Sequence, residues 1–542
     1  MTELSAETET ELRHVLGLSV AGVLSARATS DPEGTFLVLE HDEVTFGRME
    51  SRAEALAASL AGLGIEAGDR VAVVMPSWPE FVVSMFAVAK LGAVLVPLNP
   101  RLTAADLKYT LRHSEAVAAI TAETMGDLDF LQLFEELLVQ LPELQYLITV
   151  GEEDLWYDDR IFQFEDLLSA GGGRDYSAPP VEPSDDLFAI VYTSGTTGNP
   201  KGVELTHSNV VEVAVRTARV LGLGPSDRAV GVTALFHVFG LGPGIVGSVV
   251  SGSALVLQEE FGGAGSLDLI ERHRATVHHG VPTLFATELR EQKSRPRDLS
   301  SLRVGLVAGA PVSDSFVREM TEHLCPNLLV AYSVTEASST VCITRPEDPS
   351  EKRLFTVGQP IDGTRVKICD PQGGGELPVE SVGEIGVRGP GVMHGYYRQP
   401  RETSNSFDSE GYFLTGDLGI VDEEGFVHLV GRQKEVIIRG GYNVYPREVE
   451  DRLHSHPAVR EVVVAGVPDD ILGEAICACV VPDEGAIVTG QEIIDWCAAT
   501  LADYKVPDLV HFVDEFPLTG TGKVRRAELS RRIRAERERH KT

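Results

Sequence analysis

An apolar strand at Leu187–Tyr192 runs directly into a loop of small residues, and the sequence from Tyr192 to Gly202 is YTSGTTGNPKG. Glycines let main-chain amides approach an anion closely, hydroxyl groups donate further hydrogen bonds, and Lys201 adds a positive charge. The loop is not a Walker loop, because Pro200 stands where that motif requires glycine. An ordinary flexible loop is the alternative, and the Gly-x-Pro-Lys-Gly ending disfavours it. The pattern therefore predicts a triphosphate site.

Strands and helices alternate along the first two thirds of the chain. Arg70–Met75 and Ala93–Pro97 read as strands, and the segment between them, Trp78–Leu91, has apolar residues at helical spacing. Further strands are expected at Arg303–Val307 and Leu328–Tyr332. This alternation predicts an α/β fold with parallel or mixed sheets and covering helices.

The pattern changes twice towards the C-terminus. Short strands and glycine-rich turns over Val357–Val430 predict a β-subdomain. After Gly431, expected helices at Pro446–His454 and Gly490–Ala502 mix with two strands, which indicates a small α+β domain.

Composition excludes several classes of protein. The 542 residues are 43% hydrophobic, which rules out a disordered chain, and the formal net charge of −34 argues against general nucleic-acid binding. Six scattered cysteines form no disulfide framework, and the acidic N-terminus has no apolar signal segment, so a cytoplasmic location is expected.

The segment Val230–Gln258 imitates a membrane span. It contains no Asp, Glu, Lys or Arg and exceeds the ~20 residues that a spanning helix needs. However, six glycines, Pro243 and His237 interrupt it. We therefore expect a strand, a loop, a close-packed helix and a second strand in the core, and no transmembrane segment.

Ordered motifs from about residue 190 to Lys523 resemble those of the acyl-adenylate-forming (ANL) superfamily, in particular its AMP-forming acyl-CoA synthetase branch. That superfamily also includes luciferases and peptide-synthetase adenylation domains. After the phosphate loop, the matching blocks are Ala234-Leu235-Phe236-His237, Gly309-Ala310-Pro311, Tyr332-Ser333-Val334-Thr335-Glu336, Tyr412–Asp417, Gly431–Glu435 and Pro517–Lys523.

The resemblance implies that a carboxylate attacks the α-phosphate of ATP and that pyrophosphate leaves. Lys523 would bridge the two reacting groups, Glu336 would hold Mg²⁺, Thr335 would contact phosphate and His237 would line the site. Each of three residues also has a purely structural interpretation. Lys523 would be a solvated surface lysine, Glu336 a carboxylate favoured at a helix N-terminus, and His237 a core residue.

The resemblance also implies a set of residues that contact nucleotide, acid or CoA. Asp417 and Arg432 would bind ribose, and Tyr332 would stack on adenine. The structural alternatives are that Asp417 forms a turn and that Tyr332 is a core residue. The full set is Thr193, Ser194, Gly195, Thr196, Thr197, Gly198, Lys201, Gly309, Ala310, Pro311, Ala331, Tyr332, Ser333, Asp417, Arg432, Lys434 and Gly441.

Members of this superfamily rotate a small domain between two half-reactions. The resemblance therefore implies an N-terminal AMP-binding domain at 1–430, with subdomains at about 1–185, 186–335 and 336–430, and a mobile C-terminal domain at 435–542. The hinge would be 431–434, with Lys434 at the pivot. Gly441 would meet the pantetheine of CoA.

Two departures from the family pattern bear on the acid. Ser333 and Ala331 replace frequent glycines, which disfavours very long chains. No Arg or Lys lies in Val281–Thr287, which can line the acyl site. We therefore expect a short- or medium-chain or aryl monocarboxylate, consistent with a role in fatty acid metabolism.

Three functions remain open. The first is a carboxylate–CoA ligase that uses ATP, Mg²⁺, a small carboxylic acid and CoA. The second is an acid–AMP ligase that loads a carrier protein, and the third is a non-catalytic nucleotide sensor, which retention of Lys201, Glu336, Asp417 and Lys523 disfavours. A homodimer is one oligomeric state that the sequence leaves open.

Other catalytic centres are not expected. His278 and His279 are adjacent and would point apart on a strand, so they do not form a metal site. No G-x-S-x-G elbow surrounds Ser194, which excludes a serine hydrolase of that type.

Overall fold

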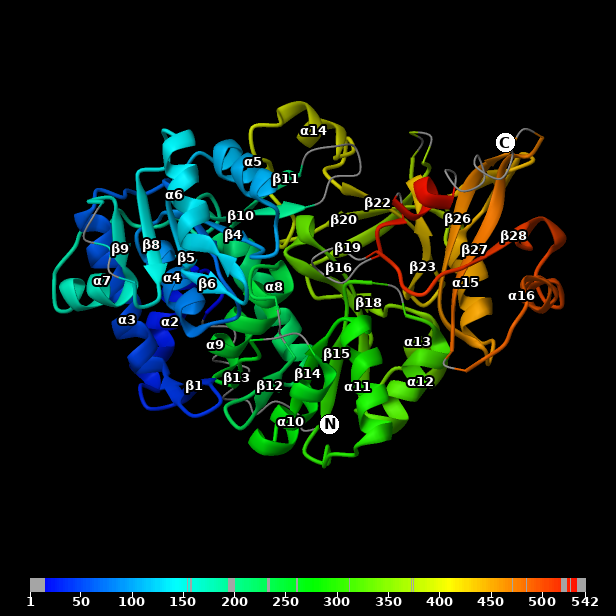
Figure 1. Ribbon diagram of the computed structural model, residues 1–542, viewed down its shortest axis with the longest axis horizontal. Coiled ribbons are helices and arrows are strands. Elements are labelled where there is room, and N and C mark those ends of the chain that lie inside the picture. Colours follow the sequence, from blue (N-terminus) through cyan, green and yellow to red (C-terminus); the bar gives the residue numbers. More distant parts are fainter. Residues whose placement is uncertain are drawn as a thin grey trace.

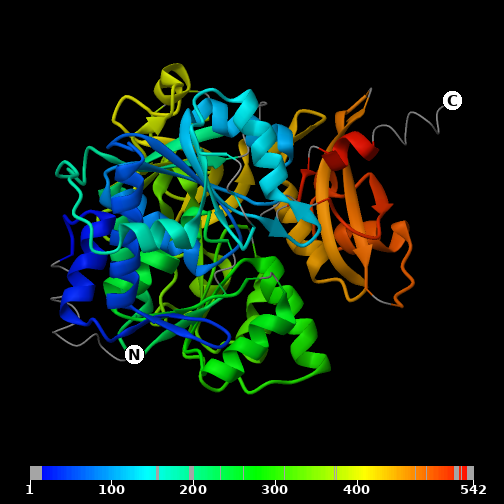
Figure 2. The same ribbon diagram turned by 60° about the vertical axis from the view of Figure 1, so that its left-hand side comes forward.

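The chain folds into a large body and a smaller C-terminal domain that lie side by side (Figures 1 and 2). The computed structural model describes residues 15–533 except 154, 156–157, 194–199, 232–233, 260–261, 311, 372, 374, 470, 484, 518–523 and 527. The predicted α/β class with a small second domain is confirmed.

An eight-stranded sheet forms one part of the body, in the order β21-β11-β10-β4-β3-β5-β8-β9. Strands β3 (Arg70–Val74) and β4 (Val94–Leu98) are parallel neighbours joined by α4 (Pro79–Lys90), which confirms the predicted strand–helix–strand unit. The other strands are β5 (Ala116–Ala122), β8 (Tyr146–Val150), β9 (Ile161–Gln163), β10 (Leu187–Thr193), β11 (Lys201–Thr206) and β21 (Gly395–Tyr396).

A nine-stranded sheet forms the second part, in the order β18-β17-β16-β15-β14-β12-β13-β1-β2. Its neighbours β12, β14, β15 and β16 are parallel, so their carboxyl ends meet at one edge. The bounds are β1 (Thr35–Val38), β2 (Glu43–Thr45), β12 (Arg228–Val230), β13 (Ala254–Val256), β14 (Val277–Gly280), β15 (Val304–Val307), β16 (Leu328–Val334), β17 (Ser339–Ile343) and β18 (Gln359–Pro360).

Helices join the two large sheets into one core. Phe86 of α4 and Val211 of α8 (His207–Leu221) are buried in the same apolar cluster as residues of both sheets. The other helices of the body are α2 (Val20–Ser30), α3 (Phe46–Gly62), α5 (Ala104–Ser114), α6 (Phe130–Gln140), α7 (Phe164–Gly171), α10 (Gly263–His273), α11 (Pro282–Ser294), α12 (Asp314–His323), α13 (Ser350–Phe355) and α14 (Pro400–Asn405).

The uncharged segment after β12 is part of this core. A π-helical stretch, Gly240–Val246, continues into α9 (Gly247–Ser251) and then into β13, as the interrupting glycines predicted. All of the residues in the π-helical stretch are buried. Among the described residues, no helix combines the length and the apolar character that crossing a bilayer requires.

A small antiparallel sheet corresponds to the predicted β-subdomain. Its strands are β19 (Arg365–Cys369), β20 (Gly383–Arg388), β22 (Phe413–Val421) and β23 (Val427–Arg432). A separate hairpin pairs β6 (Thr124–Met125) with β7 (Leu128–Asp129).

The C-terminal domain is a five-stranded sheet with apolar side chains on both faces. Val462 and Val464 pack with residues of the two helices, whereas Val463 faces Phe516 and Leu529 on the other side. Its elements are β24 (Ile437–Arg439), β25 (Tyr442–Val444), α15 (Pro446–His454), β26 (Val459–Asp469), β27 (Gly473–Pro482), α16 (Gly490–Ala498) and β28 (Leu509–Phe512).

Candidate active site

The predicted phosphate loop leaves the end of one strand and returns at the start of the next. Thr193, the last residue of β10, pairs with Lys201, the first residue of β11. The loop residues Ser194, Gly195, Thr196, Thr197 and Gly198 lie outside the described residues, as do Pro311 and Lys523.

Helix α5 holds both ends of this loop. The Tyr192 hydroxyl lies 2.8 Å from Nδ1 of His113, and the Tyr109 hydroxyl donates to the carbonyl of Pro200 over 3.3 Å. Burial raises the pKa of Tyr192 and lowers the pKa of His113, so both groups are neutral near pH 7. These contacts fix where the loop begins and ends, and sequence reasoning missed them.

Lys201 and Glu336 are brought together through Tyr396. The Lys201 ammonium lies 2.7 Å from Oε2 of Glu402 and 4.6 Å from the centre of the Tyr396 ring. The Tyr396 hydroxyl donates to Oε1 of Glu336 over 2.9 Å. The Lys201 hydrogen bond lowers the pKa of Glu402. A cation, a phenol and a carboxylate therefore line one polar patch.

Glu336 follows directly from the central sheet. Thr335 and Glu336 begin a single 3₁₀ turn, Thr335–Ala337, immediately after β16. Thr335 is buried and Glu336 is half-buried. A turn of three residues has little macrodipole, so Glu336 is held mainly by Tyr396.

Asp417 is the centre of a second polar cluster. Its Oδ2 accepts a 2.6 Å hydrogen bond from the Tyr332 hydroxyl, and its Oδ1 lies 2.7 Å from Nε of Arg432. Asp417 and Arg432 are cross-strand partners on β22 and β23. Asp417 lies within a strand, and Tyr332, which is 5% exposed, packs in an apolar cluster. Burial is the main cause of the raised pKa of Tyr332.

The carboxyl edge of the nine-stranded sheet carries the remaining residues of the body. Gly309 follows β15 at φ +89°, a conformation that favours glycine, and Ala310 after it is exposed. Ala331 is buried, and Ser333 pairs with Thr340 of β17. His237 lies half-buried after β12, and its amide donates to the carbonyl of Ala234 over 3.0 Å.

Two predicted residues lie at the start of the C-terminal domain. Lys434 is exposed in the 3₁₀ turn Gln433–Glu435, between β23 and β24. Gly441 is exposed at φ +88° in the turn between β24 and β25. The body and this domain touch where Nη2 of Arg447 donates to the carbonyl of Val312 over 3.2 Å.

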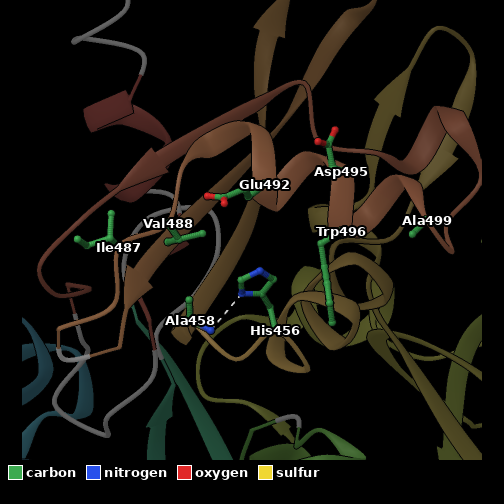
Figure 3. A pocket seen from close by; sticks show the side chains of 8 residues that line it. All are labelled: His456, Ala458, Ile487, Val488, Glu492, Asp495, Trp496 and Ala499. Atoms are coloured by element: carbon green, nitrogen blue, oxygen red, sulfur yellow. Dashed lines mark hydrogen bonds between the residues drawn. The ribbon is translucent and has the colours of Figure 1, made fainter.

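A groove of about 420 Å³ lies elsewhere, on the C-terminal domain (Figure 3). Its lining residues are His456, Ala458, Ile487, Val488, Glu492, Asp495, Trp496 and Ala499, and no predicted site residue is among them. His456 packs edge-on against Trp496 and accepts a hydrogen bond from the Ala458 amide. Within the described part of the chain, no group of three or more His, Cys, Asp or Glu side chains forms a metal site.

The body thus carries two polar clusters, Lys201–Tyr396–Glu336 and Tyr332–Asp417–Arg432, and a small separate domain follows it. The chain matches the family model of AMP-binding enzymes over residues 24–397 and the model of their C-terminal domain over residues 448–523. It belongs to this family, which confirms the resemblance found in the sequence.

Similar proteins specify the branch. The chain is 35% identical to feruloyl-CoA synthase of an Amycolatopsis species, which covers 94% of this chain and 97% of the relative. It is 31% identical to the human mitochondrial medium-chain acyl-CoA ligase ACSF2, over 97% of this chain and 89% of the relative. The anthranilate CoA ligase AuaEII, solved with anthranoyl-AMP, superposes with a TM-score of 0.89 at 28% identity, over 96% and 98% of the two chains.

The chain is therefore an AMP-forming acid–thiol ligase of the acyl-CoA synthetase branch. ATP, CoA and an acid as substrates fit this family. One relative is mitochondrial, so the cytoplasmic location stays a prediction.

Proposed function

We propose that this ligase activates a short- or medium-chain or aryl monocarboxylate as its adenylate and then transfers the acyl group to CoA. One observation carries the proposal. The path Lys201–Tyr396–Glu336 and the cluster Tyr332–Asp417–Arg432 meet at β16 and the turn after it, because Tyr332 and Glu336 are four residues apart. This closeness supports a single site at which the triphosphate and the ribose of one nucleotide would bind.

The phosphate end of the site supports charge neutralisation. A carboxylate oxygen attacks the α-phosphorus while the bond to pyrophosphate breaks, and both reactants are anionic. Lys201 would exchange its exposed partner Glu402 for phosphate oxygens. Glu336 is suited to Mg²⁺, because the hydrogen bond from Tyr396 engages only one of its two carboxylate oxygens. The other oxygen would bind the metal ion. The hard metal ion would add positive charge on the phosphates.

The ribose end supports binding at Asp417 and Arg432. Asp417 is held by two donors, so its carboxylate has a fixed orientation towards ribose hydroxyls. Adenine stacking by Tyr332 stays a prediction.

We further propose that residues 431–434 form the hinge, with Lys434 at the pivot, that Lys523 serves adenylation, and that Gly441 meets pantetheine. A homodimer also stays a prediction, which light scattering tests.

Incubation of the purified protein with ATP, Mg²⁺ and octanoate, benzoate or cinnamate, with and without CoA, tests the acceptor and the acid. Acyl-CoA and pyrophosphate are expected together. Pyrophosphate without acyl-CoA would favour an acid–AMP ligase that serves a carrier protein. Absence of pyrophosphate with every monocarboxylate would contradict the proposed acid class.

Asp417→Asn is expected to lower the free energy of unfolding by about 1–3 kcal/mol, because a charged acceptor of two hydrogen bonds becomes neutral. The KM for ATP should also rise by at least about tenfold, the effect of one lost hydrogen bond to a charged group. Urea unfolding and initial rates of pyrophosphate release measure these changes. Tyr332→Phe removes one donor and keeps the carboxylate, so it should destabilise the fold with little effect on that KM. Equal KM values for Asp417→Asn and the parent would contradict the ribose role.

A further inference from the structure

A buried histidine without a hydrogen-bond partner lies beside the predicted acyl site. His279 is the penultimate residue of β14, the strand between β12 and β15 at the edge described above. Strand β15 ends two residues before Gly309, and the segment that follows β12 contains His237. His279 is thus close to the edge of the sheet at which those residues gather.

The His279 ring has no exposed surface, and neither of its nitrogens has a hydrogen-bond partner within the described residues. Burial lowers the pKa of His279 to about 3, with a smaller contribution from His278. The ring is therefore neutral, with one N–H donor and one acceptor nitrogen. A buried polar group left unpaired is costly, so an unpaired donor and acceptor at this place require an explanation.

The adjacent histidine provides an internal comparison. His278 points to the opposite face of β14, where its Nε2 lies 2.8 Å from Oε2 of Glu288 on α11. Both side chains of that pair are buried, and Glu288 pairs with Nε2 of His278. Nδ1 of His278 has no hydrogen-bond partner in the described part of the chain. Sequence alternation predicted that the two rings point apart, and the structure confirms it. Among the described residues, His279 differs from His278 in that neither of its ring nitrogens has a partner.

The surroundings of His279 indicate what covers it. Phe239, which is half-buried and lies two residues after His237, packs edge-on against the His279 ring with the ring centres 5.7 Å apart. In the sheet, His279 is aligned with Leu306 of β15, which is buried and apolar. The ring therefore lies in an apolar wall behind a partly accessible aromatic side chain.

We propose that His279 is a specificity-determining residue of the acyl pocket and that it forms a hydrogen bond with a hydroxyl group on the chain or ring of the acid. A hydroxyl group both donates and accepts, so it can pair with whichever imidazole nitrogen faces the pocket. A site that bonds a substrate hydroxyl rejects the analogue without it. The proposal rests on the proposed function, because it assumes that the acid binds at this sheet edge.

The test compares two matched pairs of acids, 4-hydroxycinnamate with cinnamate and 8-hydroxyoctanoate with octanoate. Pyrophosphate release by the full chain gives kcat/KM for each acid. In one of the two pairs, the parent protein is expected to have a kcat/KM for the hydroxylated acid that is at least about tenfold higher than for the unsubstituted acid. His279→Leu should reduce that ratio by about tenfold and change kcat/KM for the unsubstituted acid by less than about threefold.

His279→Phe keeps a ring of similar size without nitrogens and gives the same comparison if the leucine variant does not fold. An unchanged ratio in a folded variant, or no preference in the parent for either hydroxylated acid, would overturn the inference. Absence of pyrophosphate with all four acids would instead overturn the proposed function, and this inference with it.

Discussion

Replacement of Lys523 with alanine is expected to slow adenylate formation by about 10²- to 10³-fold, the usual loss when one positioned electrostatic donor is removed. Charge builds on the α-phosphate as the carboxylate attacks, and the lysine would neutralise it. Thioester formation from a supplied acyl-adenylate should change by less than about fivefold, because that step no longer joins two anions. Pyrophosphate release and acyl-CoA formation from synthetic acyl-AMP measure the two steps separately.

Lys505→Ala is the matched control for this variant. Lys505 lies on the same domain and forms a surface pair with Glu448 over 2.6 Å. Loss of that pair should change the rates of both half-reactions by less than about twofold, since surface ion pairs contribute little to stability. Comparable losses of both steps in Lys523→Ala would contradict the proposed division between the half-reactions.

Local periodicity was sufficient to predict most of the architecture. The helix at Pro446–His454 has the predicted bounds, and β3 and α4 differ from their predictions by only one residue at some ends. In its described residues, the uncharged segment Val230–Gln258 also has the predicted order of elements, since β12 is followed by a buried helical stretch and then by β13.

The pairing of site residues could not be predicted in the same way. Tyr332 and Asp417 are far apart in the sequence, and only the packing of the small antiparallel sheet beside β16 brings the phenol to the carboxylate. Tyr396 and Glu402 were missed because neither lies in a motif with a recognised spacing. The repeated aromatic at Tyr396-Tyr397, next to a glycine, was a signal that could have indicated a short strand. Side-chain partners depend on tertiary contacts, which local patterns do not contain.

Glu336→Gln is expected to lower the rate of adenylation by about 10²-fold and to raise the Mg²⁺ concentration needed for half-maximal rate. The amide is isosteric and still accepts a hydrogen bond from Tyr396, so the fold should be retained. It has no negative charge, and a neutral amide is a weaker ligand for a hard cation. Initial rates over a Mg²⁺ titration at fixed ATP, with thermal unfolding of the same samples, measure both effects.

The Tyr396→Phe variant tests whether Glu336 is a metal ligand or only a positioning residue. This variant keeps Glu336 and removes the hydrogen bond that orients it, so the loss should be about tenfold and the Mg²⁺ dependence should shift less. Lys201 also lies over this ring, and phenylalanine preserves that contact. If Glu336→Gln left the Mg²⁺ dependence unchanged while slowing the reaction as little as Tyr396→Phe, Glu336 would be a positioning residue and the metal would be held elsewhere.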